Sequence, residues 1–120
     1  MDCERWTVVV VPFPFTDRAR DRRRPAVVVS QPEALAERVG HSVLAMVTSA
    51  RNPSWPLDVP LCDQSGAGLE APSVVRMKLF TLDHRFILRT IGHLGEDDRR
   101  AVAASLAALL GTEGTDSPGS

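Results

Sequence analysis

The residues best suited to chemistry lie in a basic segment, residues 17–24. This segment holds five arginines and two aspartates, so its local charge is +3 in a chain whose net charge is −1. Guanidinium groups bind phosphate oxygens through paired hydrogen bonds and stack on bases. The segment is therefore either a nucleic-acid contact or a solvated surface loop, and charge alone leaves both interpretations open. The candidate contacts are Arg18, Arg20, Arg22, Arg23 and Arg24.

Arg24 differs from its neighbours because Pro25 follows it. A proline disfavours the helical region for the preceding residue and pushes that residue into an extended conformation. Arg24 is then oriented by the start of a strand rather than by a loop, as a catalytic or phosphate-binding arginine requires. An arginine on an edge strand with no such role would fit the same pattern.

A second loop, residues 51–56, holds Arg51 and Trp55 among polar residues and prolines. The indole of Trp55 is suited to stacking on an unpaired base, an interaction of about 1–3 kcal/mol in such sites. A half-buried tryptophan that packs against the protein is the alternative interpretation.

The remaining titratable residues suggest less. Histidines are natural acid–base groups near neutral pH, but His41, His84 and His93 are spread over separate predicted elements. Cys3 and Cys62 are far apart and have no metal-ligand spacing. We therefore expect neither a metal nor another cofactor.

The elements that must position these residues are mostly short strands. Apolar runs rich in valine are bounded by Pro, Gly, Asn and Asp, a pattern typical of strands. Unbroken runs such as 8–11 and 27–29 predict burial on both faces, as in a small barrel. The predicted strands span residues 6–11, 25–30, 41–49, 57–61, 73–82 and 86–94, with a short helical turn over 32–38.

The pattern then changes to a helical period. Val102, Leu106, Leu109 and Leu110 recur at helical spacing over residues 96–110, and three acidic residues begin this stretch. Gly111 stands where a helix commonly ends. We predict one domain, residues 1–111, which is a mainly β barrel with a C-terminal helix, and a disordered tail, residues 112–120.

Bulk properties are those of a single globular domain. The chain has 120 residues, 43% of them hydrophobic and 24% charged. It lacks an apolar stretch near the ~20 residues of a membrane span, and its first residues do not follow the order of a signal peptide. We expect a cytoplasmic protein with reduced cysteines and no membrane partner.

Several segments, taken together, resemble the MazF/PemK family of type II toxin–antitoxin toxins. The resemblance extends over about residues 6–110, and its most specific part is Arg-Pro-Ala-Val-Val after Phe-Pro-Phe-Thr. Many members carry Gly-Asp just before the first strand, where this chain has Arg5-Trp6-Thr7. The segments are residues 11–17 (Val-Pro-Phe-Pro-Phe-Thr-Asp), 23–30 (Arg-Arg-Pro-Ala-Val-Val-Val-Ser), 47–49 (Val-Thr-Ser), 72–82 and 91–94 (Ile-Gly-His-Leu).

The resemblance implies an SH3-like barrel of the CcdB/MazF type that forms a homodimer and binds a cognate antitoxin. It also implies an mRNA interferase, a metal-independent endoribonuclease that cuts single-stranded RNA at specific sequences and leaves 2′,3′-cyclic phosphate and 5′-OH ends. The family's functional arginine and threonine correspond to Arg24 and Thr48, with Ser49 beside the threonine. A fixed guanidinium and a hydroxyl donor suit the stabilisation of a phosphorane. Arginine is a poor base near neutral pH, so the proton transfers stay unassigned.

Two other functions remain open at this point. The same barrel in related toxins binds DNA gyrase instead of cutting RNA, although such a protein needs no Arg-Pro junction beside a strand-end hydroxyl. A catalytically inactive homologue that only binds RNA or an antitoxin would show the same motifs.

Overall fold

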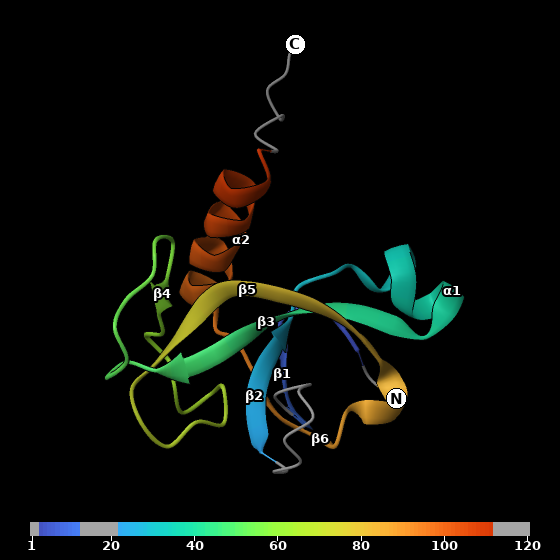
Figure 1. The fold of residues 1–120 in the computed structure, drawn as a ribbon, viewed down its shortest axis with the longest axis horizontal. Coiled ribbons are helices and arrows are strands. Elements are labelled where there is room, and N and C mark those ends of the chain that lie inside the picture. Colours follow the sequence, from blue (N-terminus) through green and yellow to red (C-terminus); the bar gives the residue numbers. More distant parts are fainter. Residues whose placement is uncertain (1–2, 13–21, 112–120) are drawn as a thin grey trace.

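The fold is a strongly curled, six-stranded antiparallel sheet with one long helix against it, as seen in a computed structural model that describes residues 3–12 and 22–111 (Figure 1). The order of strands in the sheet is β4-β5-β3-β2-β1-β6. This half-barrel confirms the predicted fold class, which is mainly β with a short helix between strands and a C-terminal helix. The strands are β1 (Thr7–Pro12), β2 (Arg23–Val28), β3 (His41–Ser49), β4 (Val59–Pro60), β5 (Ser73–Asp83) and β6 (Arg89–His93).

The valine-rich strands are buried on both faces, as the sequence predicts. Side chains alternate across a strand, and the valines of β1 divide accordingly between two hydrophobic clusters. Val8 belongs to a cluster that reaches the C-terminal helix, whereas Val9 and Val11 belong to a second cluster on the other face. The curl of the sheet closes this second cluster with Leu82 from the far end of β5.

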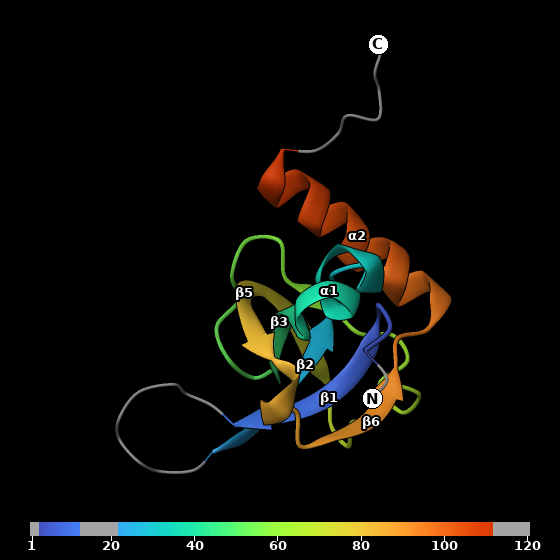
Figure 2. The same ribbon diagram turned by 90° about the vertical axis from the view of Figure 1, so that its right-hand side faces the viewer.

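The helix α2 (Glu96–Leu110) lies across one side of the sheet (Figures 1 and 2). Its buried side chains are Asp98, Val102 and Leu106, which are four residues apart and share one face. Leu109 and Leu110, which recur at the same helical spacing, are 43% and 60% exposed in this single chain. The buried position one turn before Val102 is occupied by Asp98, which is 2% exposed.

Several predicted boundaries shift in the structure. β1 includes Pro12, and β2 begins at Arg23, so Arg24 and Pro25 lie inside a strand rather than at its start. Proline lacks a backbone donor, yet Pro25 stays in register opposite Val10.

The predicted strand over 86–94 starts only at Arg89. The preceding residues form the 3₁₀ turn η2 (His84–Phe86), which begins where the Asp83 carboxylate accepts a hydrogen bond from the Arg85 backbone N–H at 2.9 Å. The predicted strand over 57–61 is reduced to the two residues of β4. The predicted turn over 32–38 consists of a π-helical turn, η1 (Pro32–Ala36), and a short α-helical turn, α1 (Glu37–Val39). The predicted tail, residues 112–120, lies outside the described residues.

Neither cysteine forms a disulfide bond, and Cys3 is buried whereas Cys62 is exposed. Within residues 3–12 and 22–111, none of the helices is both long and apolar enough to cross a membrane.

Candidate active site

The strand register brings Arg24 and Thr48 to the same end of neighbouring strands. β2 and β3 are antiparallel, with Ala26 opposite Met46 and Val28 opposite Leu44. The paired residues end at Ala26 and Met46, and Arg24 and Thr48 each lie two residues farther along, at the same open end of the ladder. Because side chains alternate across a strand, Arg24 lies on the face of Ala26 and Thr48 on the face of Met46, and Ala26 and Met46 belong to one hydrophobic cluster. The two residues predicted to form the site therefore share one face of the sheet.

A cavity of about 390 Å³ opens at this end of the sheet, and both Arg24 and Thr48 line it. Both side chains are partly buried, so each is held by its surroundings while one part faces the cavity. The other polar lining comes from two more arginines of the basic segment and from hydroxyls on the ends of β3 and β5. None of the described lining residues is a histidine or a carboxylate. The polar lining consists of Arg22, Arg23, Arg24, Thr48, Ser49 and Ser73.

This composition gives the cavity the properties of an anion site. Three guanidinium groups raise the local positive potential in a near-neutral protein, and a partly enclosed wall strengthens that field. Hydroxyl groups supply neutral donors that can be directed at a single oxygen. A phosphodiester is the kind of group that fits both.

The hydroxyl of Thr48 has a partner that the sequence did not suggest. Asn52 Nδ2 donates a hydrogen bond to Thr48 Oγ1 at 2.6 Å. Asn52 is itself held by its backbone N–H, which donates to the carbonyl of Ser49 at 3.1 Å. An asparagine four residues after a strand-end threonine is a signal that could have been noticed, since such a turn returns to the strand end.

The loop that follows Thr48 is fixed at its other end by an ion pair. Arg76 on β5 donates from Nε and Nη2 to the two carboxylate oxygens of Asp58, at 3.1 and 2.9 Å. The Arg76 hydrogen bonds lower the pKa of the Asp58 carboxyl, and the Asp58 carboxylate raises the pKa of Arg76. Asp58 and Arg76 are 18 residues apart, and sequence reasoning gave neither of them a role.

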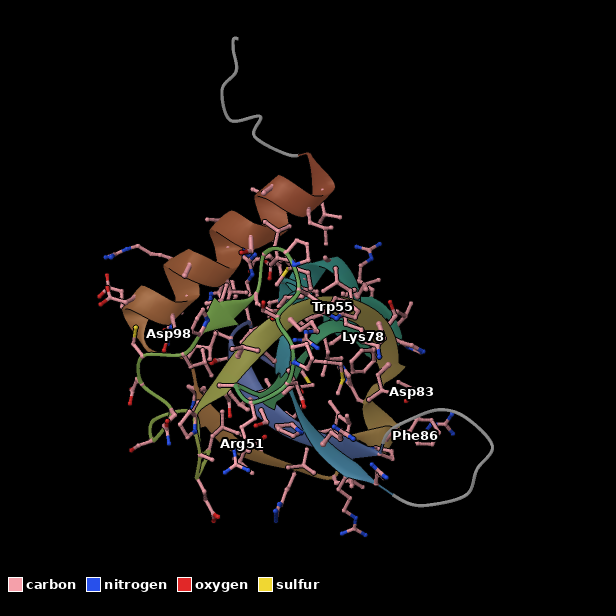
Figure 3. All side chains as sticks on the ribbon, turned by 60° about the vertical axis from the view of Figure 1, so that its left-hand side comes forward. Arg51, Trp55, Lys78, Asp83, Phe86 and Asp98 are labelled. Atoms are coloured by element: carbon pink, nitrogen blue, oxygen red, sulfur yellow. The ribbon has the colours of Figure 1, made fainter. Side chains whose placement is uncertain are left out.

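The other predicted contact residues are placed differently. Arg22 and Arg23 line the cavity, whereas Arg18 and Arg20 lie outside the described residues. Ser49 lines the cavity, and its Oγ accepts a hydrogen bond from the backbone N–H of Arg51 at 3.1 Å. Arg51 and Trp55 are exposed on the neighbouring loop and do not line the cavity; Figure 3 shows them well apart on that loop.

Two of the histidines, His41 and His84, lie at a different end of the sheet from the cavity. His84 Nε2 and the buried hydroxyl of Ser42 are hydrogen-bonded at 2.8 Å, at the far end of β3 from Thr48. The ring of His41 lies 4.0 Å from the carboxylate of Asp83 at the same end. These contacts connect the ends of β3 and β5 to each other, away from the cavity.

The chain matches both a family model and solved structures of the same kind of protein. The family model described as PemK-like, MazF-like toxin of type II toxin–antitoxin system matches residues 4–110. The MazE–MazF complex of Deinococcus radiodurans includes a chain with 27% sequence identity and a TM-score of 0.71; the match covers 90% of this chain and 95% of that one. No curated protein sequence compared with the chain is similar enough to count as a relative.

Two mycobacterial structures share the fold at lower identity. The Mycobacterium tuberculosis toxin MazF-mt6 is 20% identical, with a TM-score of 0.69 over 88% of this chain and 96% of that one. An endoribonuclease in complex with its cognate antitoxin, from a mycobacterial species, is 17% identical, with a TM-score of 0.69 over 92% of this chain and 96% of that one.

Proposed function

Because this chain belongs to the PemK-like, MazF-like toxins of type II toxin–antitoxin systems, we propose that it is a sequence-specific endoribonuclease that cuts single-stranded RNA without a metal. The observation that carries the proposal is that Arg24 and Thr48 line the same cavity, together with other guanidinium and hydroxyl groups. Such donors suit a phosphate, whereas Mg²⁺ prefers carboxylate and other oxygen ligands.

The reaction follows from what these groups can stabilise. The 2′-oxygen of one ribose attacks the adjacent phosphorus and loses its proton, and the bond from phosphorus to the 5′-oxygen breaks as that oxygen gains a proton. The products are a 2′,3′-cyclic phosphate and a 5′-OH end. Arg24 binds the phosphate oxygens whose negative charge increases in the transition state, and the Thr48 hydroxyl donates to one of them.

The neighbouring residues bind the rest of the substrate. Arg22 and Arg23, on the rim of the same cavity, contact flanking phosphates and so contribute affinity without sequence preference. Ser49 and Arg51 begin the loop that contacts the bases. The chain acts as a homodimer, and a cognate antitoxin with an acidic segment inhibits it by competing with RNA for the basic surface.

The proposal is tested by incubating the purified protein with a long unstructured RNA in EDTA and mapping the 5′ ends. We expect discrete cuts that carry 5′-OH ends. Arg24→Ala should abolish them while the protein stays folded. Arg38→Ala is the matched control, because Arg38 is an exposed arginine on α1, at the opposite end of β3 from Thr48.

Two results would overturn the proposal. Near-normal cleavage by Arg24→Ala would remove the residue on which the mechanism depends. The absence of cleavage by the folded wild-type protein would favour a toxin that binds gyrase, or a homologue that only binds RNA or the antitoxin.

A further inference from the structure

The pair Asp58–Arg76 lies on the same face of the sheet as the candidate active site. Thr48 faces Val74 across the β3–β5 ladder. Arg76 follows Val74 by two residues, so its side chain points to the same face, about 7 Å farther along β5 at roughly 3.4 Å per residue. Whatever Arg76 holds in place is therefore close to the RNA strand that would pass Thr48.

What Arg76 holds is the loop between β3 and β4. Besides its two hydrogen bonds to Asp58, Arg76 Nη2 donates to the carbonyl of Pro53 at 2.8 Å. Asp58 Oδ2 also accepts a hydrogen bond from the backbone N–H of Trp55 at 2.9 Å. The side chains of Arg76 and Asp58 are only 11% and 8% exposed, so water competes weakly for these contacts. Arg76 and Asp58 thus fix the backbone at the tryptophan and two residues before it.

Trp55 is left in a position suited to stacking. The guanidinium carbon of Arg76 lies 4.8 Å from the centroid of the Trp55 ring, so the cation covers one face of the indole. Trp55 is nevertheless 45% exposed, so a large part of the residue stays accessible although Arg76 covers one face of the ring. A fixed aromatic face beside a basic cavity is the usual platform for an unpaired base.

The charge of Arg76 is paired with the Asp58 carboxylate. Both of its hydrogen-bonding nitrogens point to Asp58 or to the carbonyl of Pro53, and the carboxylate neutralises the guanidinium. Arg76 is therefore poorly placed to bind a phosphate, unlike the arginines of the basic segment. Its function is to hold the indole.

We propose that Trp55 stacks on one unpaired base of the RNA near the cut, and that Arg76 and Asp58 are the positioning residues that preorganise this subsite. This inference rests on the proposed function. Preorganisation lowers the ordering cost of binding, so the pair acts on affinity and on the choice of sequence rather than on the chemical step.

The test uses binding, so that it does not depend on cleavage. The probes are fluorescent single-stranded 2′-O-methyl oligonucleotides, one homopolymer for each base, which lack the 2′-OH nucleophile. Trp55→Ala should weaken binding of the preferred probe roughly 5- to 150-fold, the range that a stacked base gives. Trp55→Phe should recover most of that loss. Asp58→Asn and Arg76→Lys should weaken binding in the same direction as Trp55→Ala.

The positioning role is separated from a structural one by the double variant. If Arg76 acts through the indole, Arg76→Ala combined with Trp55→Ala binds no more weakly than Trp55→Ala alone. On cleavable RNA, Arg76→Ala should raise KM while kcat changes by less than about threefold. The matched control is Arg85→Ala, because Arg85 pairs with Asp83 at 3.1 Å and lies 5.8 Å from the Phe86 ring at the other end of β5 (Figure 3).

Three results would overturn the inference: wild-type affinity in Trp55→Ala, additive losses in the double variant, or an equal loss in Arg85→Ala. Because the probes cannot be cut, binding that depends on Trp55 would stand even if the wild-type protein cleaved no RNA. Conversely, cleavage with no dependence on Trp55 would remove this inference alone.

Discussion

Asn52 should control the orientation of the Thr48 hydroxyl, which we propose to be catalytic. A threonine hydroxyl has one proton to donate and two lone pairs that accept. Asn52 Nδ2 occupies one lone pair at 2.6 Å, which directs the Thr48 proton away from the asparagine and leaves it for the cavity. In Asn52→Ala the hydroxyl rotates freely. A hydrogen bond of this kind contributes about 0.5–1.5 kcal/mol, so we expect kcat to fall about 2- to 12-fold.

The assay is a double-mutant cycle in single-turnover cleavage of a mapped RNA site. Thr48→Val removes the hydroxyl at nearly constant shape and should lower the rate by roughly 10²–10³-fold, as for the loss of one transition-state donor. On that background Asn52→Ala should have no further effect, because there is no hydroxyl left to orient. The coupling free energy then equals the whole effect of Asn52→Ala in the wild-type protein.

Two further variants make the test specific. Asn52→Asp cannot donate and places a negative charge near the scissile phosphate, so it should lose at least as much activity as Asn52→Ala. Ser54→Ala, which is exposed in the same loop, is the control and should retain wild-type activity. An equal loss from Asn52→Ala with and without the Thr48 hydroxyl would refute the reasoning.

Three more predictions concern stability. In Asp98→Ala two backbone N–H groups lose the carboxylate that accepts their hydrogen bonds at 2.9–3.2 Å, so urea unfolding should show a free energy of unfolding lower by about 2–4 kcal/mol. Asp97→Ala, at the exposed neighbouring position, should change this free energy little. Gly92→Ala would place a Cβ in collision with the backbone of Ala67, and thermal unfolding should show a loss of about 1–3 kcal/mol. The hydrogen bonds from Arg76 lower the pKa of Asp58 in the folded protein. The Asp58 carboxylate therefore contributes its full stabilisation of the fold above its ordinary pKa near 4, and this stabilisation is lost as the pH falls through the lowered pKa. The difference in unfolding free energy between the wild-type protein and Asp58→Asn should disappear over that acidic range and not at neutral pH.

The sequence predicted most of the fold because the local patterns agree with the tertiary structure. Val8, Val9 and Val11 could only be buried on both faces, and the helical period after residue 96 was unambiguous. The exposure of Leu109 and Leu110 could not be predicted, because periodicity shows which residues share a face but not how far along the helix that face is covered.

The candidate site was predicted in part. Arg24 was singled out by the proline that follows it and by the family resemblance, whereas Thr48 was named through the resemblance alone; in the structure both line one cavity. The pair Asp58–Arg76 depends on how a loop folds onto a strand, which no local pattern encodes. For Asp98 the sequence contains part of the information. Asp98 precedes Val102 by four residues on the buried helix face, so its burial could have been inferred, whereas its three hydrogen bonds could not.

The position of Arg24 and Thr48 at the ends of neighbouring strands also bears on how such a protein can change over evolution. Both residues lie two positions beyond the paired residues Ala26 and Met46, so their relative position depends on the backbone hydrogen bonds between β2 and β3 more than on which side chains fill the barrel. Substitutions that move α2 relative to the sheet would leave this backbone pairing in place. The hydrophobic clusters can therefore change in composition over evolution while the relative position of the two proposed catalytic residues is kept.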